Sequence, residues 1–256
     1  MNLSLSNLAW NNDTTDIVLP LLKERGIAQI EGVLTKLGDW DILTDEILTT
    51  FKTKLDVNGI KMKSIQSIFY NLKCYGIKDT DVVYEHILRL LNFCKIFGIE
   101  VMVFGSPNMR KGCVDKSLIE IFTIIDNMLD GSGVELSIEP NSKIYGGDYF
   151  YNLHEITEFI IKNKYKNIKT MIDTHNLILE GYDPSVEFLK YKNQINHIHI
   201  SEVNLKPINN LEFHKNFSNI LKVGNYEKTI TYEVNNLINI DTNINTFIEL
   251  YNIIKK

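Results

Sequence analysis

Short runs of apolar and β-branched residues recur along the 256-residue sequence, each followed by a polar turn and an amphipathic stretch. Runs of this kind, spaced roughly 25 to 40 residues apart, predict strands that alternate with helices. The expected strands are residues 2–10, 27–33, 60–68, 99–106, 133–140, 168–174, 195–201 and 229–235. Eight βα units in a chain of this length favour an α/β fold, a (β/α)8 TIM barrel.

The amphipathic stretches begin after Asp, Asn or Thr and end near Gly or Lys, as helix capping favours. Expected helices include residues 16–26, 81–98, 115–131, 152–164, 186–193 and 243–256. Pro20 predicts that the first helix starts late or kinks. The first strand lacks a following GxGxxG, which disfavours a dinucleotide-binding sheet. No Pro/Gly/Ser-rich linker divides the chain, so we expect a single domain over residues 1–256.

Composition narrows the class of protein. Hydrophobic residues make up 44% of the chain and charged residues 23%, as in soluble globular proteins. The net charge of −5 and the lack of clustered Lys and Arg argue against a nucleic-acid partner. Neither a long apolar run nor a signal-peptide pattern is visible, so we expect no membrane partner. Cys74, Cys94 and Cys113 are widely spaced and form no CxxC, which suits a cytoplasmic protein.

Polar residues gather at the ends of the last four expected strands: Glu139, Asp173, His199 and Glu233. In a βα barrel these ends meet at one rim, where catalytic groups lie. Taken alone, an acidic residue at a strand end is more often a solvated loop group or a helix cap than a ligand. Together, three neighbouring carboxylates would repel one another, and a divalent cation would relieve that repulsion. The donor set suits Mn²⁺, Mg²⁺ or Co²⁺, and the imidazole is also compatible with Zn²⁺.

Eight motifs occur in order along the chain: "SNLAW", "IEGVLTKLG", "IQSIFY", "VFGSPNMR", "IEPNSKIYGGDYF", "MIDTHN", "HIHISEVN" and "ITYEVN". In these motifs the chain resembles the xylose isomerase-like barrel superfamily of sugar isomerases and epimerases, which includes D-tagatose 3-epimerase, hydroxypyruvate isomerase and endonuclease IV. The resemblance implies that Glu139, Asp173, His199 and Glu233 bind a divalent metal. It also implies that Glu139 and Glu233 are the catalytic pair that transfers protons, with His197 as a neighbour.

Three positions depart from the pattern of the D-tagatose 3-epimerases. Tyr145 stands where those enzymes carry Glu, Asn176 where they carry His, and Leu205 where they carry Arg. Because these positions orient the substrate, ketohexose 3-epimerase activity is in doubt. The DNA-repair branch fits less well, since its multi-zinc site uses many histidines and this chain has six.

The expected reaction is isomerisation or epimerisation of a sugar or sugar derivative. A carboxylate would remove a proton next to a carbonyl, and a metal would stabilise the enediolate. A metal-dependent lyase or dehydratase of a polyol or keto acid is the main alternative, and a non-catalytic sugar-binding barrel is a third. A homo-oligomer is also compatible with the resemblance.

Further polar and aromatic side chains near the strand ends are candidates for contacts with a small carbohydrate. Arg110 and Lys206 suit a phosphate or carboxylate, and they fit solvated loop charges as well. The candidates for substrate binding are Trp10, Gln66, Asn108, Arg110, Asn141, His175, Glu202 and Lys206, together with Glu31, Ser106 and His214.

Overall fold

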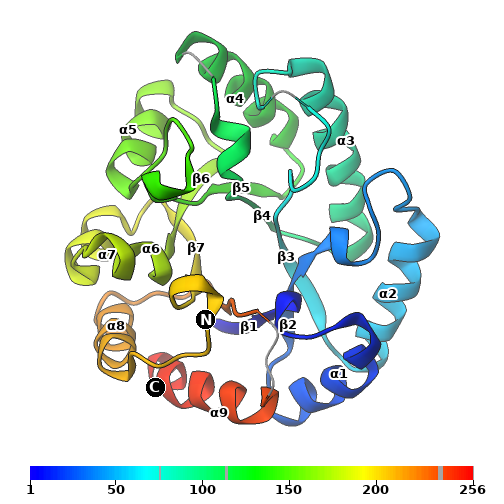
Figure 1. Cartoon of the computed structure of the whole chain (residues 1–256), viewed down its shortest axis with the longest axis vertical. Helices are drawn as coiled ribbons and strands as arrows, with labels where there is room; N and C mark the ends of the chain where they lie inside the picture. The colour runs from blue at the N-terminus through cyan, green and yellow to red at the C-terminus, as the bar shows by residue number, and fades with distance from the viewer. Residues whose placement is uncertain (75, 113–114, 236–238, 256) are drawn as a thin grey trace.

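All eight predicted strands form, and they close into one parallel barrel (Figure 1). The computed structural model describes residues 1–74, 76–112, 115–235 and 239–255. Each strand pairs with the next one in the chain, and β1 pairs with β8, which completes the ring. The strands are β1 (Asn2–Ser6), β2 (Gln29–Val33), β3 (Lys61–Gln66), β4 (Val101–Phe104), β5 (Glu135–Ile138), β6 (Ile168–Asp173), β7 (Ile195–Ile200) and β8 (Thr229–Tyr232). The predicted (β/α)8 fold is confirmed.

Helices surround the barrel on its outer face (Figure 1). They are α1 (Thr15–Glu24), α2 (Asp45–Val57), α3 (Thr80–Phe97), α4 (Asp115–Leu129), α5 (Leu153–Asn163), α6 (Thr174–Glu180), α7 (Pro184–Tyr191), α8 (Leu211–Val223) and α9 (Ile240–Tyr251). Pro20 was expected to delay or to kink the first helix. The delay is wrong, because α1 begins five residues before Pro20, and the kink stays a prediction. No helix among the described residues combines the length and apolar character needed to cross a bilayer.

Local chemistry sets the helix ends that border the site. The side chain of Asn152 caps α5 by accepting from the backbone N–H of Glu155, and the Glu155 carboxylate accepts from the N–H groups of Phe150 and Tyr151 at 2.8 and 2.9 Å. This reciprocal arrangement satisfies N–H groups that a helix start leaves unpaired. It fixes the loop that runs from β5 to α5.

Burial on both faces explains why the strands read as near-continuous apolar runs. Every residue of β7 is buried, including His197 and His199. Cys74 and Cys94 are free thiols, and Cys113 lies outside the described residues. The buried polar side chains of the strands therefore lie in an otherwise apolar interior, and those of Asp173 and His199 lie at or near the carboxyl ends of β6 and β7.

Candidate functional site

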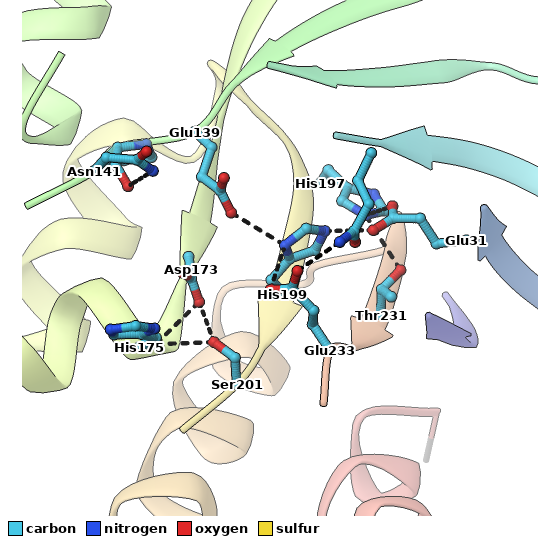
Figure 2. A network of polar contacts seen from close by, with 12 residues as sticks. Glu31, Glu139, Asn141, Asp173, His175, His197, His199, Ser201, Thr231 and Glu233 are labelled. Atoms are coloured by element: carbon cyan, nitrogen blue, oxygen red, sulfur yellow. Dashed lines mark hydrogen bonds and ion pairs between the residues drawn. The ribbon is translucent and has the colours of Figure 1, made fainter. Parts of the chain in front are cut away.

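The four residues predicted at the strand ends lie together at one rim of the barrel (Figure 2). Asp173 is the last residue of β6 and pairs in register with His199 of β7. Glu139 and Glu233 directly follow β5 and β8, and their backbone N–H groups donate to the carbonyls of the neighbouring strands at 3.1 and 2.9 Å. Strand pairing thus extends to each of these residues and fixes where its side chain starts.

His199 stands at the centre of the group. Its Nδ1 lies 3.2 Å from Oε1 of Glu139 and 3.3 Å from Oε2 of Glu233. This nitrogen is buried and has no hydrogen-bond partner among the described residues. A buried ring nitrogen facing two carboxylates indicates a place for a shared positive charge.

The spacing of these atoms fits a divalent cation. Neighbouring donor atoms that share one ion at bond lengths of about 2.0–2.2 Å lie about 2.8–3.1 Å apart in octahedral geometry and about 3.3–3.6 Å apart in tetrahedral geometry. The two separations from His199 lie between the extremes of these two ranges. Glu139, His199 and Glu233 also form a group whose ligand atoms all lie within 4.8 Å of one another. The residues present therefore fit the metal that the donor set predicted.

Asp173 lies outside that group of three. Its Oδ1 accepts from the hydroxyl of Ser201 and from the backbone N–H of His175, the latter at 3.0 Å. Burial, together with the charges of Glu139 and Glu233, raises the pKa of Asp173 to about 8. Burial, the larger cause, and the neighbouring carboxylates both disfavour a negative charge on Asp173, and a cation at the rim would offset them.

A second buried group joins Glu31 of β2 to the two histidines of β7. Nε2 of His199 lies 2.6 Å from Oε1 of Glu31, and Nε2 of His197 lies 2.7 Å from Oε2. These separations are shorter than two ligands of one ion allow, and they match charge-assisted hydrogen-bond distances. Burial alone would raise the pKa of Glu31, but the histidines outweigh it and hold the pKa well below its usual range.

A cavity of about 440 Å³ opens beside these residues. Its described lining contains Pro107, Glu139, Pro140, Asn141, Ser142, Tyr145, Asp173, His175, Asn176, Asn204, Leu205 and Glu233. An adjoining hollow of about 180 Å³ shares Glu139 and Glu233 and reaches Gln66 and His199. The two carboxylates therefore border both hollows.

Four of the predicted substrate contacts lie at these hollows, and one of them, Ser106, lines the smaller hollow. Gln66 donates from Nε2 to Oε1 of Glu233 at 2.6 Å, so it also orients a carboxylate. Asn141 and His175 line the larger cavity. His175 pairs through Nε2 with the hydroxyl of Tyr145 at 2.8 Å. Tyr145 was noted in the sequence only as a departure, and here it is part of the cavity wall.

Two predicted contacts have buried side chains that are engaged elsewhere. The guanidinium of Arg110 is fully buried and donates to the carbonyls of Phe104, Glu139 and Phe150 at 2.7 to 3.1 Å. Arg110 therefore holds the backbone of Glu139, a proposed ligand. The prediction that its guanidinium contacts the substrate is wrong, because its N–H groups bind backbone carbonyls instead. Trp10 is buried and donates from Nε1 to Thr15 at 3.2 Å, away from both hollows.

The candidates from the loop after β7 also lie away from the cavity. Oε1 of Glu202 accepts from the backbone N–H groups of Asn209 and Asn210 and faces Nε2 of His214 at 3.2 Å. Glu202 thus holds the start of α8 in place. The prediction that it contacts the substrate is wrong, because it lines neither hollow. Lys206 and Asn108 are exposed, and neither lines the described walls of the two hollows.

Gly105 contributes to the site through its lack of a side chain. It follows β4, and a Cβ at this position would lie 1.9 Å from Oε2 of Glu139. The carboxylate of Glu139 therefore rests directly on the Gly105 backbone. The motif "FGSPNMR" contained this signal, because a glycine directly after a barrel strand suggests a close approach.

Comparisons with known proteins agree with this fold. A family model described as "Xylose isomerase-like TIM barrel" matches residues 19–245. A 3-keto-D-glucoside 4-epimerase from E. coli is similar in structure, with a TM-score of 0.77, 14% identity, and coverage of 98% of this chain and 99% of that one. An AP endonuclease of family 2 from Brucella melitensis has a TM-score of 0.77, 15% identity, and coverage of 97% and 99%.

A D-psicose 3-epimerase, crystallised in the presence of D-fructose, has a TM-score of 0.73, 17% identity, and coverage of 96% of this chain and 90% of that one. The curated proteins contain no match to the sequence. At these identities the solved structures establish the fold, while the family model spans most of the chain. The chain therefore belongs to the xylose isomerase-like TIM barrel family.

Proposed function

We propose that this protein is a divalent-metal-dependent isomerase or epimerase of a sugar or sugar derivative. The observation that carries the proposal is the placement of Nδ1 of His199, which is buried between the carboxylates of Glu139 and Glu233 beside the smaller hollow. Similar folds are found in sugar epimerases, which supports the class of reaction.

Glu139, His199 and Glu233 would hold the cation, with Asp173 beside them. A bound divalent cation would supply positive charge next to the carbonyl and hydroxyl oxygens of the sugar, where negative charge develops when a proton is removed. Mn²⁺, Mg²⁺ or Co²⁺ suits the oxygen-rich donors, and Zn²⁺ is compatible with the histidine.

Glu139 and Glu233 would also move the proton. Both carboxylates line the cavity, and they come from strands that lie well apart in the barrel. Gln66 orients one of them, and contact with Gly105 orients the other. An epimerase would remove the proton with one carboxylate and return one to the opposite face with the other. Proton transfer of this kind contributes about 10²- to 10⁴-fold to a rate.

The cavity lining supports an uncharged substrate. None of its described residues is a Lys or Arg, and three carboxylates face the space. Arg110 is engaged with backbone carbonyls, and Lys206 lines neither hollow. Asn141 and the hydroxyl of Tyr145 offer hydrogen bonds that suit sugar hydroxyls. A free sugar is therefore favoured over its phosphate.

Incubation with free ketoses, their phosphates and hydroxy-keto acids in deuterated buffer with Mn²⁺ tests the proposal. We expect deuterium to enter the carbon next to the carbonyl, and we expect a chelator to stop the exchange. Glu139→Gln and Glu233→Gln should each reduce exchange at least 10²-fold, since each loses a proton carrier. Asn108→Ala, at an exposed position outside the cavity, serves as the control.

Lack of exchange with every substrate, despite bound metal, would refute the proposal. Loss of water from a substrate, seen as a change in product mass, would instead establish the lyase or dehydratase alternative.

A further inference from the structure

Glu31 reaches across the inside of the barrel to the proposed metal ligand His199. Glu31 lies in β2 and His199 in β7, and these strands are separated in the ring by β1 and β8. Both side chains are almost completely buried, at 0% and 1% exposure. Because β2 and β7 are not paired strands, no backbone hydrogen bonds between them bring these residues together. The contact depends on the two side chains themselves.

The contact engages one ring nitrogen of His199 and leaves the other for a different partner. Nε2 lies 2.6 Å from Oε1 of Glu31 in hydrogen-bond geometry, while Nδ1 faces Glu139 and Glu233 (Figure 2). A carboxylate can only accept, so Nε2 must donate its N–H. In the neutral imidazole, Nδ1 then carries the lone pair.

The backbone around Glu31 is adapted to this contact. The register between β2 and β3 shifts between Ile30 and Glu31. As a result, no residue of β2 lies opposite Lys63 of β3. Irregularities of this kind re-aim side chains next to active sites. A carboxylate inside a barrel strand also costs free energy unless it is paired, and the histidines of β7 supply that pairing.

We propose that Glu31 is a positioning residue that keeps the proton of His199 on Nε2 and thereby presents Nδ1 to the metal. The inference rests on the proposed function, since it needs a cation at Glu139 and Glu233. His197 has a supporting place, because its Nε2 lies 2.7 Å from Oε2 of Glu31 and 3.2 Å from the hydroxyl of Thr231. The hydrogen bond of His197 Nε2 is with Thr231, and its contact with Glu31 is an ion-pair distance only. The inference therefore concerns only the contact between Glu31 and His199.

A series of variants at position 31 tests the role through metal affinity. Glu31→Gln keeps one acceptor without the charge, and Glu31→Met keeps a similar volume without any acceptor. Loss of a partner that orients a ligand weakens metal binding about 10- to 100-fold. We expect Mn²⁺ affinity, measured by competition with a chelator, to fall about tenfold in the Gln variant and about 100-fold in the Met variant.

Thr231→Val is the matched control, because it removes one buried contact near His197 and leaves Glu31 in place. It should bind Mn²⁺ as the unmodified protein does. Glu139→Gln removes a proposed ligand and should lose binding. Thermal unfolding of each variant shows whether it is folded.

Nitrogen-15 NMR of labelled histidines gives a readout that does not depend on turnover or on the stability of the variants. In the unmodified protein loaded with Zn²⁺, His199 should carry its proton on Nε2 and the metal on Nδ1. Metal on Nε2, or wild-type Mn²⁺ affinity in a folded Glu31→Met variant, would overturn the inference and leave the proposed function intact. Failure of the unmodified protein to bind any metal would overturn both.

Discussion

Replacement of Gly105 by alanine is expected to disable the site while leaving the barrel folded. The new Cβ would lie 1.9 Å from Oε2 of Glu139, and real contacts of this kind are not shorter than 3.0 Å. The carboxylate must therefore move by about 1 Å, several times the tolerance of about 0.2 Å in metal–ligand distances. A misplacement of about 1 Å in a reacting group can lower a rate about 10²-fold.

The change in stability should be small by comparison. Gly105 is not among the residues with positive φ, so alanine is compatible with its backbone. The atom that must move is the end of a flexible side chain. We expect the free energy of unfolding to change by about 1 kcal/mol or less, because the clash is partly offset by the lower entropy of the unfolded chain.

Mn²⁺ affinity and deuterium exchange measured on the same preparation provide the assay, with chemical denaturation to measure stability. Gly224→Ala is the matched control, because its Cβ would meet the ring of Phe188 at 2.2 Å, away from the metal site. That variant should lose stability and keep its metal affinity. Unchanged affinity and exchange in Gly105→Ala, or losses that only follow stability in both variants, would refute the reasoning.

Three further changes have defined outcomes. Arg110→Met should lower the free energy of unfolding by about 3 kcal/mol in a denaturant titration, because three buried carbonyls lose their donor; unchanged stability would contradict this. Tyr145→Phe removes the hydroxyl that meets His175, so KM should rise up to about tenfold with unchanged Mn²⁺ affinity and unfolding; a loss of metal binding would instead link this pair to the ligands. Burial lowers the pKa of His199, but Glu31 and Glu233 outweigh it and raise the pKa well above its usual range. Bound metal must displace that proton, so affinity measured between pH 6 and 8 should strengthen about tenfold per unit as pH rises; a flat profile would argue against the assignment of His199.

Local patterns in the sequence were sufficient for the barrel, because each strand is a short apolar run that is buried on both faces. The placement of Glu139, Asp173, His199 and Glu233 at one rim followed from barrel geometry alone. Helices α2, α6 and α8 were not among the ranges named from the sequence, and in α2 the segment "DEILTTFKTKLDV" contains three Thr, whose β-branched side chain weakens a helical pattern.

The partners of individual side chains could not be predicted from local patterns. Arg110 suggested an anion site by residue type, yet tertiary packing directs its guanidinium to the backbone of three segments. Glu202 suggested a substrate contact, yet the chain returns to offer it two backbone N–H groups. Contacts of Glu31 with β7 join residues more than 160 positions apart, which no strand or helix period encodes.

The contact between Glu31 of β2 and His199 of β7 joins the two halves of the chain, and the two halves contribute unequally to the site. Every proposed metal ligand lies after residue 133, whereas the carboxylate that orients the histidine belongs to the first 33 residues. A fragment containing only the second half would possess all the ligands and lack the group that aims one of them. Metal affinity would then report whether two separately produced halves have joined correctly, which makes the cation a probe of barrel assembly in addition to its proposed role in catalysis.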